Sequence, residues 1–311
     1  MPETYVITGG AGFIGSHIAE RLLRDGQHVR IVDNFSTGKR ENLAAIPAGF
    51  ELFEISITDR AALDAAFAGA DYVLHEAALP SVPRSIDDPL TSHDYNLTGT
   101  LNVLLAARDA GVKRVVYAAS SSAYGDIEGE HKVETMAPRP LSPYGVQKLA
   151  GEYYCQAFTQ VYGLETVALR YFNVFGPRQD ETSAYAAVIP RFLAALLRGE
   201  APIIYGDGLQ SRDFTYVENV VHGNLLALRA PAASGQMMNL ATGGRVTLLD
   251  LSERLNRILG THIAPVHEAP RAGDIKHSRA DISKAEALLG FTPVADFDEG
   301  LARTVAWFRS R

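Results

Sequence analysis

Residues 4–18 read TYVITGGAGFIGSHI, and this stretch decides the fold. The β-branched run Thr4–Thr8 predicts a strand, and a helical pattern opens within the turn that carries Gly9, Gly12 and Gly15. Glycines in such a turn let the backbone approach a pyrophosphate, and the start of the helix offers free N–H groups with partial positive charge. A tight turn without a ligand is the alternative for the glycines alone. The strand–turn–helix order predicts the first unit of a dinucleotide-binding domain.

An acid ends the next predicted strand. Asp33 closes the run HVRIVD, where a carboxylate would hold the adenosine ribose hydroxyls and disfavour a 2′-phosphate. We therefore expect NAD rather than NADP. Lys39 and Arg40 follow closely and could favour a 2′-phosphate, but we interpret them as part of a solvated loop.

Strand and helix patterns alternate through the first half of the chain. We expect strands at 4–8, 28–33, 51–55, 71–75, 114–119 and 165–170, and helices at 14–24, 60–67, 97–110 and from 144 onward. This alternation predicts an α/β fold, a Rossmann-type doubly wound parallel sheet with helices on both faces. The later sequence is turn-rich and predicts a smaller C-terminal substrate lobe. We place the NAD-binding domain at 1–171 plus about 215–245, and the lobe at about 172–214 and 246–311.

Composition excludes several classes of protein. The 311 residues are 47% apolar and 21% charged, which predicts a packed globular core, and the net charge of −7 argues against a nucleic-acid partner. No apolar run approaches the roughly 18 residues of a membrane span. The N-terminus enters a strand without a signal peptide. Cys155 is the only cysteine and the nine histidines lack ligand spacing, so we expect no disulfide, no metal and a cytoplasmic protein.

Three consecutive hydroxyls follow a buried strand in the stretch AASSSAYGD, residues 118–126. Tyr144 and Lys148 come next, one helical turn apart on one face. A phenol titrates near ~10, and we expect Lys148 and a positively charged nicotinamide to lower this pKa so that Tyr144 acts as a base. Taken alone, the serine run could be a polar loop, and Tyr144 and Lys148 could be an ordinary pair on a helix surface. Both features belong to the sheet edge where ligands of such folds bind.

Taken together, these residues resemble the extended short-chain dehydrogenase/reductases, and especially the UDP-sugar 4-epimerases that handle N-acetylated sugars. The resemblance covers nearly the whole chain and includes TGGAGFIG, DNFSTG, HEAA, NLTGTLNVLLAA, SSSAYG, SPYGVQK, LRYFNVFGPRQD, AAVIPRF, GDGLQSRDFTYVEN and RAGDIKHSRADISKAEALLG. It implies NAD as the cofactor. The cofactor-binding residues that it implies are Gly9, Gly12, Phe13, Ile14, Gly15, Asp33, Asn34, Ser36, Gly38, Ile57, Ala77, Ala78, Asn96, Tyr144, Lys148 and Tyr171.

The resemblance further implies a catalytic set of Ser120, Tyr144 and Lys148. In such a site the tyrosine takes the proton of the sugar 4-hydroxyl while hydride passes from C4 to NAD. The 4-keto sugar then turns over and receives the hydride on its opposite face. Dehydratase relatives carry an Asp–Glu pair where this chain has Ser121 and Ser122, because elimination needs an acid and a base at neighbouring carbons. The neutral hydroxyls, as substrate contacts, therefore favour an epimerase.

Substrate contacts are also implied by the resemblance. The residues that match diphosphate contacts are Asn173, Arg212 and Arg271, and those that would line the uracil and ribose are Val188, Tyr205 and Asp274. Arginine suits this role because its planar fork meets two phosphate oxygens at once. Ser81 and Arg84 would lie near the sugar, and Arg84 could alternatively hold a uronate carboxylate.

The choice of sugar depends on Ser278. Relatives that are limited to glucose and galactose tend to carry a bulky tyrosine at this place, so a serine favours UDP-N-acetylglucosamine and UDP-N-acetylgalactosamine, with plain UDP-hexoses also accommodated. A UDP-glucose or UDP-glucuronate 4-epimerase is the alternative. A dehydratase or reductase and a non-catalytic NAD-binding sensor are less favoured.

The adenine contact and the oligomeric state are the last two features that the sequence bears on. Relatives often carry an acid near adenine where this chain has Ser56, so that contact is in doubt unless Asp59 replaces it. The helices at 97–110 and from Tyr144 are apolar on more than one side, and relatives commonly dimerise through this pair, so we expect a homodimer.

Overall fold

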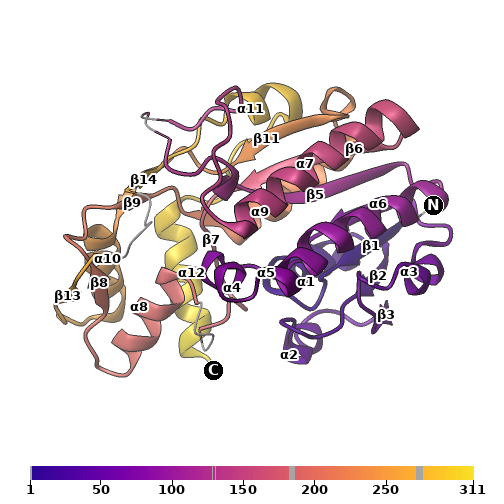
Figure 1. Ribbon diagram of the computed structural model, residues 1–311. Helices are drawn as coiled ribbons and strands as arrows, with labels where there is room; N and C mark the ends of the chain where they lie inside the picture. Colours follow the sequence, from indigo (N-terminus) through magenta and orange to yellow (C-terminus); the bar gives the residue numbers. More distant parts are fainter. Residues whose placement is uncertain (1, 128, 130, 182–185, 271–275) are drawn as a thin grey trace.

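A seven-stranded parallel sheet forms the frame of the molecule (Figure 1). The computed structural model describes residues 2–127, 129, 131–181, 186–270 and 276–311. In spatial order the strands are β11 (Gln236–Leu240), β6 (Glu165–Tyr171), β5 (Arg114–Ser120), β4 (Tyr72–His75), β1 (Thr4–Thr8), β2 (His28–Val32) and β3 (Phe50–Phe53). The predicted Rossmann-type sheet is therefore confirmed, with its order reversing between β1 and β4.

Helices cover both faces of this sheet. One face packs against α1 (Phe13–Arg24), α9 (Val217–Arg229) and α11 (Ser283–Leu289), and the other against α3 (Arg60–Phe67), α6 (Gly99–Asp109) and α7 (Pro143–Tyr162). Successive strand residues alternate between these layers, so that Val6 lies in one apolar core and Ile7 in the other. Burial on both faces explains why the strands read as continuous apolar runs.

A second, smaller core lies beside the sheet and is built from helices and very short strands (Figure 1). Its helices are α8 (Val188–Leu197), α10 (Leu248–Leu259) and α12 (Phe297–Arg309). Its strands are β8 (Ile203–Tyr205), β9 (Ser211–Arg212), β12 (Val246–Thr247), β13 (Val266–Glu268) and β14 (His277–Ser278). The pair β7 (Val174–Phe175) and β10 (Thr215–Tyr216) joins this lobe to the end of β6.

The segment between β4 and α6 is more helical than the sequence predicts. It contains α4 (Val82–Asp87), α5 (Pro89–His93) and a π-helical turn, η1 (Asp94–Thr98), so the expected helix at 97–110 begins as a π turn. Both short helices start with a capping side chain followed by proline near the first position: Ser81 accepts from the Arg84 amide and Asp88 from the Thr91 amide. The remaining short elements are α2 (Arg40–Ala44) and the 3₁₀ turns η2 (Ser121–Ala123) and η3 (Pro231–Ala233).

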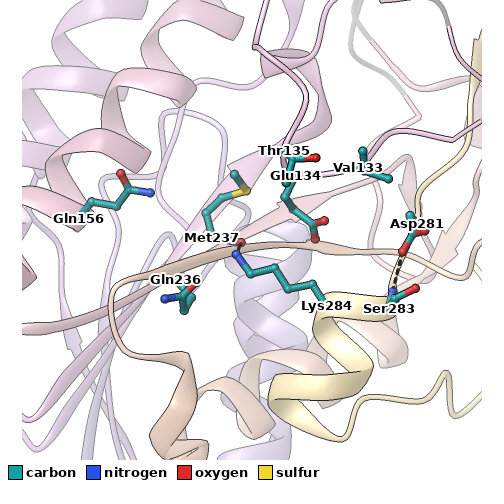
Figure 2. A pocket seen from close by; sticks show the side chains of 9 residues that line it. All are labelled: Val133, Glu134, Thr135, Gln156, Gln236, Met237, Asp281, Ser283 and Lys284. Atoms are coloured by element: carbon teal, nitrogen blue, oxygen red, sulfur yellow. Dashed lines mark hydrogen bonds between the residues drawn. The ribbon is translucent and has the colours of Figure 1, made fainter.

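The outer edge of the sheet, at β11, is covered by side chains (Figure 2). A hollow of about 520 Å³ lies there between residues 133–135, Gln156 and the start of α11. Within it Lys284 Nζ donates to the Met237 carbonyl (2.7 Å), and Glu134 Oε1 accepts from the Asn239 amide (2.8 Å). These bonds satisfy edge groups that would otherwise be open to another strand. Among the described residues, no helix is long and apolar enough to cross a membrane.

Candidate active site

A cleft of about 800 Å³ opens at the carboxyl ends of β1, β2, β4, β5 and β6. It brings together the glycine turn, the loop after β2, the end of β5, the start of α7 and residues 171–180. Nineteen of the predicted site residues line it: Gly9, Gly12, Phe13, Ile14, Gly15, Asp33, Asn34, Ser36, Gly38, Ile57, Ala77, Ala78, Ser81, Arg84, Ser120, Tyr144, Lys148, Tyr171 and Asn173. Segments far apart in the sequence thus converge on one site.

The glycine turn approaches its neighbours too closely for side chains. Gly9 adopts a left-handed φ of 70°, and a Cβ there would lie 2.7 Å from the Ala77 amide nitrogen. A Cβ at Gly15 would collide with the Gly9 carbonyl. Gly12 caps α1 without any side-chain acceptor, so amides at the start of this helix remain available to a ligand. This cradle fits the pyrophosphate of a dinucleotide.

Asp33, the predicted contact of the adenosine ribose, lies just beyond β2. Its Oδ2 accepts from the Ala11 amide (2.9 Å) and its Oδ1 from the Phe35 amide (2.8 Å), which fixes the carboxylate at the wall of the cleft. Burial raises the pKa of Asp33, while the two amides oppose this shift. A Cβ on Gly38 would touch both carboxylate oxygens, so the loop folds tightly over the acid. This placement fits ribose hydroxyls.

The two cations that follow Asp33 already have carboxylate partners. Lys39 Nζ lies 2.7 Å from Asp180 Oδ1, which comes from the far wall of the cleft, and Arg40 pairs with Glu54 at 2.7 Å. A 2′-phosphate would have to compete with these acids for either cation. The arrangement agrees with the expectation of NAD.

Ser120 and Tyr144 meet at the inner end of the cleft. Ser120 closes β5 and its Oγ accepts from the Ser122 amide (3.2 Å) and hydroxyl (2.9 Å), and the same side chain hydrogen-bonds the Tyr144 phenol. The Tyr144 amide donates to Ser85 Oγ (3.1 Å), which holds the start of α7 against α4. Ser121 and Ser122 do not line the cleft in the part of the chain described, and Ser122 instead supports Ser120.

Lys148 is buried one turn further along α7. Its Nζ donates to the Ala118 carbonyl (2.7 Å) and lies 4.9 Å from the centre of the Tyr117 ring. Burial lowers the pKa of Lys148 to about 8. Burial raises the pKa of Tyr144 to about 12, although its hydrogen bond with Ser120 opposes this. In the protein without cofactor, Lys148 therefore does not lower the pKa of Tyr144 as the sequence predicts. The phenolate needs further positive charge, such as that of an oxidised nicotinamide.

Asn96, one of the predicted cofactor contacts, is held by hydrogen bonds within the protein. It is buried in η1 and does not line the described part of the cleft. Its Oδ1 accepts from the Leu79 amide (2.8 Å), and its Nδ2 donates to Gln147 Oε1 (2.9 Å). Asn96 therefore ties the loop that precedes Ser81 to α7, and its contact with the cofactor stays a prediction.

The adenine end also differs from the usual pattern of relatives. Ser56 bonds Thr58 (2.8 Å), and Asp59 caps α3 by accepting from the Ala62 amide (3.1 Å). Among described residues, neither Ser56 nor Asp59 lines the cleft, whereas the apolar Ile57 does.

Three of the predicted UDP contacts, and Ser278, lie in the lobe away from the wall of this cleft. Val188, Tyr205, Arg212 and Ser278 are not among the described residues that line it. Arg212 and Ser278 are direct partners in the register of β9 and β14. Asn173 does line the cleft, and its Nδ2 donates to the Asp213 carbonyl (3.1 Å). Arg271 and Asp274 lie outside the described residues.

The structure adds lining residues that sequence reasoning missed. Glu76 follows β4 directly, as Asp33 follows β2. An acid at the end of a buried strand could therefore have predicted Glu76 as a site residue. Arg178 and Asp180 come from the segment after β7 and carry no such local signal.

Comparison with known proteins agrees with this site. Residues 5–241 match the NAD dependent epimerase/dehydratase family. The UDP-glucose 4-epimerase of Mycolicibacterium smegmatis is 38% identical over 98% of both chains. The solved UDP-N-acetylglucosamine 4-epimerase of Methanobrevibacter ruminantium M1, in complex with UDP-N-acetylmuramic acid, is 43% identical over 100% of this chain and 99% of that one, with a TM-score of 0.95. The Thermus thermophilus UDP-glucose 4-epimerase, solved with NAD, is 38% identical over 98% and 99%, with a TM-score of 0.90.

A glycine cradle, a ribose-facing acid and a serine–tyrosine–lysine set therefore converge in a chain that matches this family over most of its length. The chain belongs to the NAD dependent epimerase/dehydratase family and is an NAD-dependent epimerase.

Proposed function

We propose that the protein is a UDP-sugar 4-epimerase that interconverts UDP-N-acetylglucosamine and UDP-N-acetylgalactosamine. The observation that carries this proposal is the meeting of Ser120, Tyr144 and Lys148 in one cleft, next to neutral Ser121 and Ser122 rather than acids. The likeness to a solved UDP-N-acetylglucosamine 4-epimerase supports it. Relatives named for UDP-glucose are also similar, so these similarities alone do not identify the sugar.

The residues of the inner cleft can perform the proton half of such a reaction. Bound NAD supplies a reversible hydride acceptor. Tyr144 is suited to take the proton of the 4-hydroxyl and later return it, because it lies beside Ser120 at the reactive end. The Ser120 hydroxyl can hydrogen-bond the same oxygen, and Lys148 provides a cation and donor. Since Ser121 and Ser122 cannot serve as an acid–base pair, elimination of water is disfavoured.

The preference for an acetylated sugar rests on Ser278. This residue is buried and lies opposite Arg212, the expected diphosphate contact, in the β9–β14 pairing. A serine leaves room for an acetamido group near the anchored diphosphate, whereas a tyrosine would fill it. Room permits both sugars, and it does not by itself exclude plain hexoses.

The first test is an assay without added cofactor. Purified protein is incubated separately with UDP-N-acetylglucosamine and UDP-glucose, and the 4-epimers are resolved by chromatography. We expect UDP-N-acetylgalactosamine to form, because the cofactor ends each turnover in its starting state and can stay bound. Epimer from UDP-glucose alone would overturn the inference from Ser278. No product from either sugar, even with NAD added, would overturn the proposed reaction.

We also propose that two copies pair through α6 and α7. The outer stripe of α7 exposes apolar side chains, with Val146 52%, Tyr153 55% and Val161 69% exposed. Such a stripe on a long helix fits a second apolar surface better than water. Light scattering at low micromolar concentration tests this, and a monomer mass would contradict it.

A further inference from the structure

Glu76 is an acidic residue at the reactive end of the cleft that the proposed proton transfer does not use. It follows β4 directly and lines the cleft together with Lys148 and Tyr171. An acid so close to the catalytic set is costly unless its charge has a partner.

The Glu76 carboxyl group is held in place by a chain of hydrogen bonds. The Tyr171 hydroxyl donates to Glu76 Oε1 (2.9 Å), and Asn224 Nδ2 donates to the Tyr171 oxygen (2.7 Å). Asn224 is buried in α9 and also donates to the Val220 carbonyl (2.8 Å). The carboxyl group is therefore anchored through β6 to the helix layer on one face of the sheet.

Lys148 has two acids within its electrostatic reach, Glu76 and Glu152. Glu152 is occupied, because its two oxygens accept from Arg170 at 2.8 and 2.7 Å with both side chains only 2% exposed. Glu76 instead accepts from a neutral phenol, so its negative charge remains for the ammonium of Lys148.

The other titratable neighbours of Lys148 are neutral at physiological pH. Burial raises the pKa of the Cys155 thiol and of the Tyr117 phenol, and it lowers the pKa of His75 to about 3. Tyr144 has a pKa of about 12 because of its burial. None of these groups supplies a negative charge to the lysine.

We propose that Glu76 is a positioning residue of the epimerase: its anchored carboxylate holds Lys148 in the ammonium form that the reaction needs beside Tyr144. Burial disfavours the charged form of both groups, raising the pKa of Glu76 to about 7 and lowering that of Lys148 to about 8. Each charge opposes this effect at the other site. Removal of the Glu76 carboxylate therefore leaves the buried ammonium of Lys148 with Glu152, which is already paired with Arg170, as the remaining acid.

The test is Glu76→Gln, whose amide oxygen can still accept from Tyr171 while the charge is lost. Selective side-chain labelling suits this protein, because it has six lysines. We expect the titration of Lys148, read by NMR and assigned with Lys148→Met, to move down by about one pH unit or more. We also expect the alkaline limb of the kcat profile to move down by the same amount, since activity that needs an ammonium is lost as pH rises through its pKa.

Two variants sharpen this test. Glu134→Gln removes a hydrogen-bonded carboxylate at the β11 edge and should move neither the titration nor the alkaline limb. Tyr171→Phe removes the bond that favours the Glu76 carboxylate, so it should shift Lys148 in the same direction by a smaller amount.

Three outcomes would overturn the proposal: an unchanged Lys148 titration in Glu76→Gln, a moved titration with an unmoved alkaline limb, or a uniform loss of activity at every pH. The inference rests on the proposed 4-epimerase reaction only for the kcat profile, measured with whichever UDP-sugar turns over. The titration needs no substrate, so failure of the proposed function and failure of the role of Glu76 are distinguishable.

Discussion

The two walls of the cleft are built in different ways. The cofactor wall comes from the ends of neighbouring strands in one sheet, with Asp33, Glu76 and Ser120 each at or just beyond a strand end. The substrate wall comes from α4 and the segment after β7, and behind it lies a lobe whose strands are two or three residues long. The hydrogen-bond ladder of the sheet fixes the strand ends next to one another. The positions of the short lobe strands depend instead on side-chain packing.

This difference predicts separate roles for the two walls. Hydrogen bonds to neighbouring groups of η2, α4 and β5 hold Ser120, Tyr144 and Lys148 respectively. Arg212 is held by lobe carbonyls, with Nη1 donating to Ser211 (3.0 Å) and Lys276 (3.3 Å). We expect changes in the cofactor wall to abolish turnover or cofactor binding, and changes in the lobe to alter which sugar is accepted.

The largest effect is expected from Tyr144→Phe. Removal of the phenol removes the proton acceptor, so kcat should fall by about a thousandfold with little change in substrate affinity. Tyr153→Phe, at an exposed position of the same helix, is the matched control and should keep normal turnover. Comparable activity in the two variants would show that the reactive end lies elsewhere.

Gly9→Ala should weaken cofactor binding next. The new Cβ would meet the Ala77 amide at 2.7 Å in a left-handed backbone, a strain of about 1–3 kcal/mol, so we expect NAD affinity to drop by at least about tenfold. Gly26→Ala has a similar φ of 73° but no atom within 4 Å, so it shares the backbone strain without the collision. Calorimetric NAD affinities that are equal in both variants would contradict a close-approach role for Gly9.

Ser278→Tyr probes the lobe behind the substrate wall. The larger side chain should reduce kcat/KM for UDP-N-acetylglucosamine relative to UDP-glucose by at least about tenfold, because the acetamido group loses its space. Ser278→Ala keeps the space and should leave the ratio nearly unchanged. An unaltered ratio in the tyrosine variant would place the acetamido group away from Ser278.

The smallest effect is expected where the two walls touch. Lys39 and Asp180 form an ion pair across the cleft with side chains 37% and 38% exposed, and such pairs contribute ~0.2–1 kcal/mol. Lys39→Ala should therefore speed NAD release by up to about fivefold in stopped-flow experiments, and less so at high salt. Arg40→Ala is the control: it breaks the exposed pair with Glu54 and the contact with the Phe35 ring, but it leaves the pair across the cleft intact. Equal release rates would remove this contact from cofactor retention.

Local patterns accounted for the large domain and its chemical centre. Gly9, Asp33, Ser120 and Lys148 were predictable because each belongs to a strand–turn–helix unit, and parallel strands bring such units to one edge of a sheet. The short helices α4 and α5 were missed although their capping residues are in the sequence, because five- and six-residue helices give too little periodicity.

The tertiary structure alone decided how these residues act. Asn96 accepts from the Leu79 amide, Lys39 pairs with Asp180 of a distant segment, and the Ser122 hydroxyl donates to Ser120. The sign of the shift in the pKa of Tyr144 depends on burial, which no spacing of residues reveals. Local patterns in the sequence were enough to predict the sheet, the cofactor and the side chains that meet at one sheet edge. Their charges and contacts needed the fold, because burial and pairing depend on neighbours that are remote in the chain.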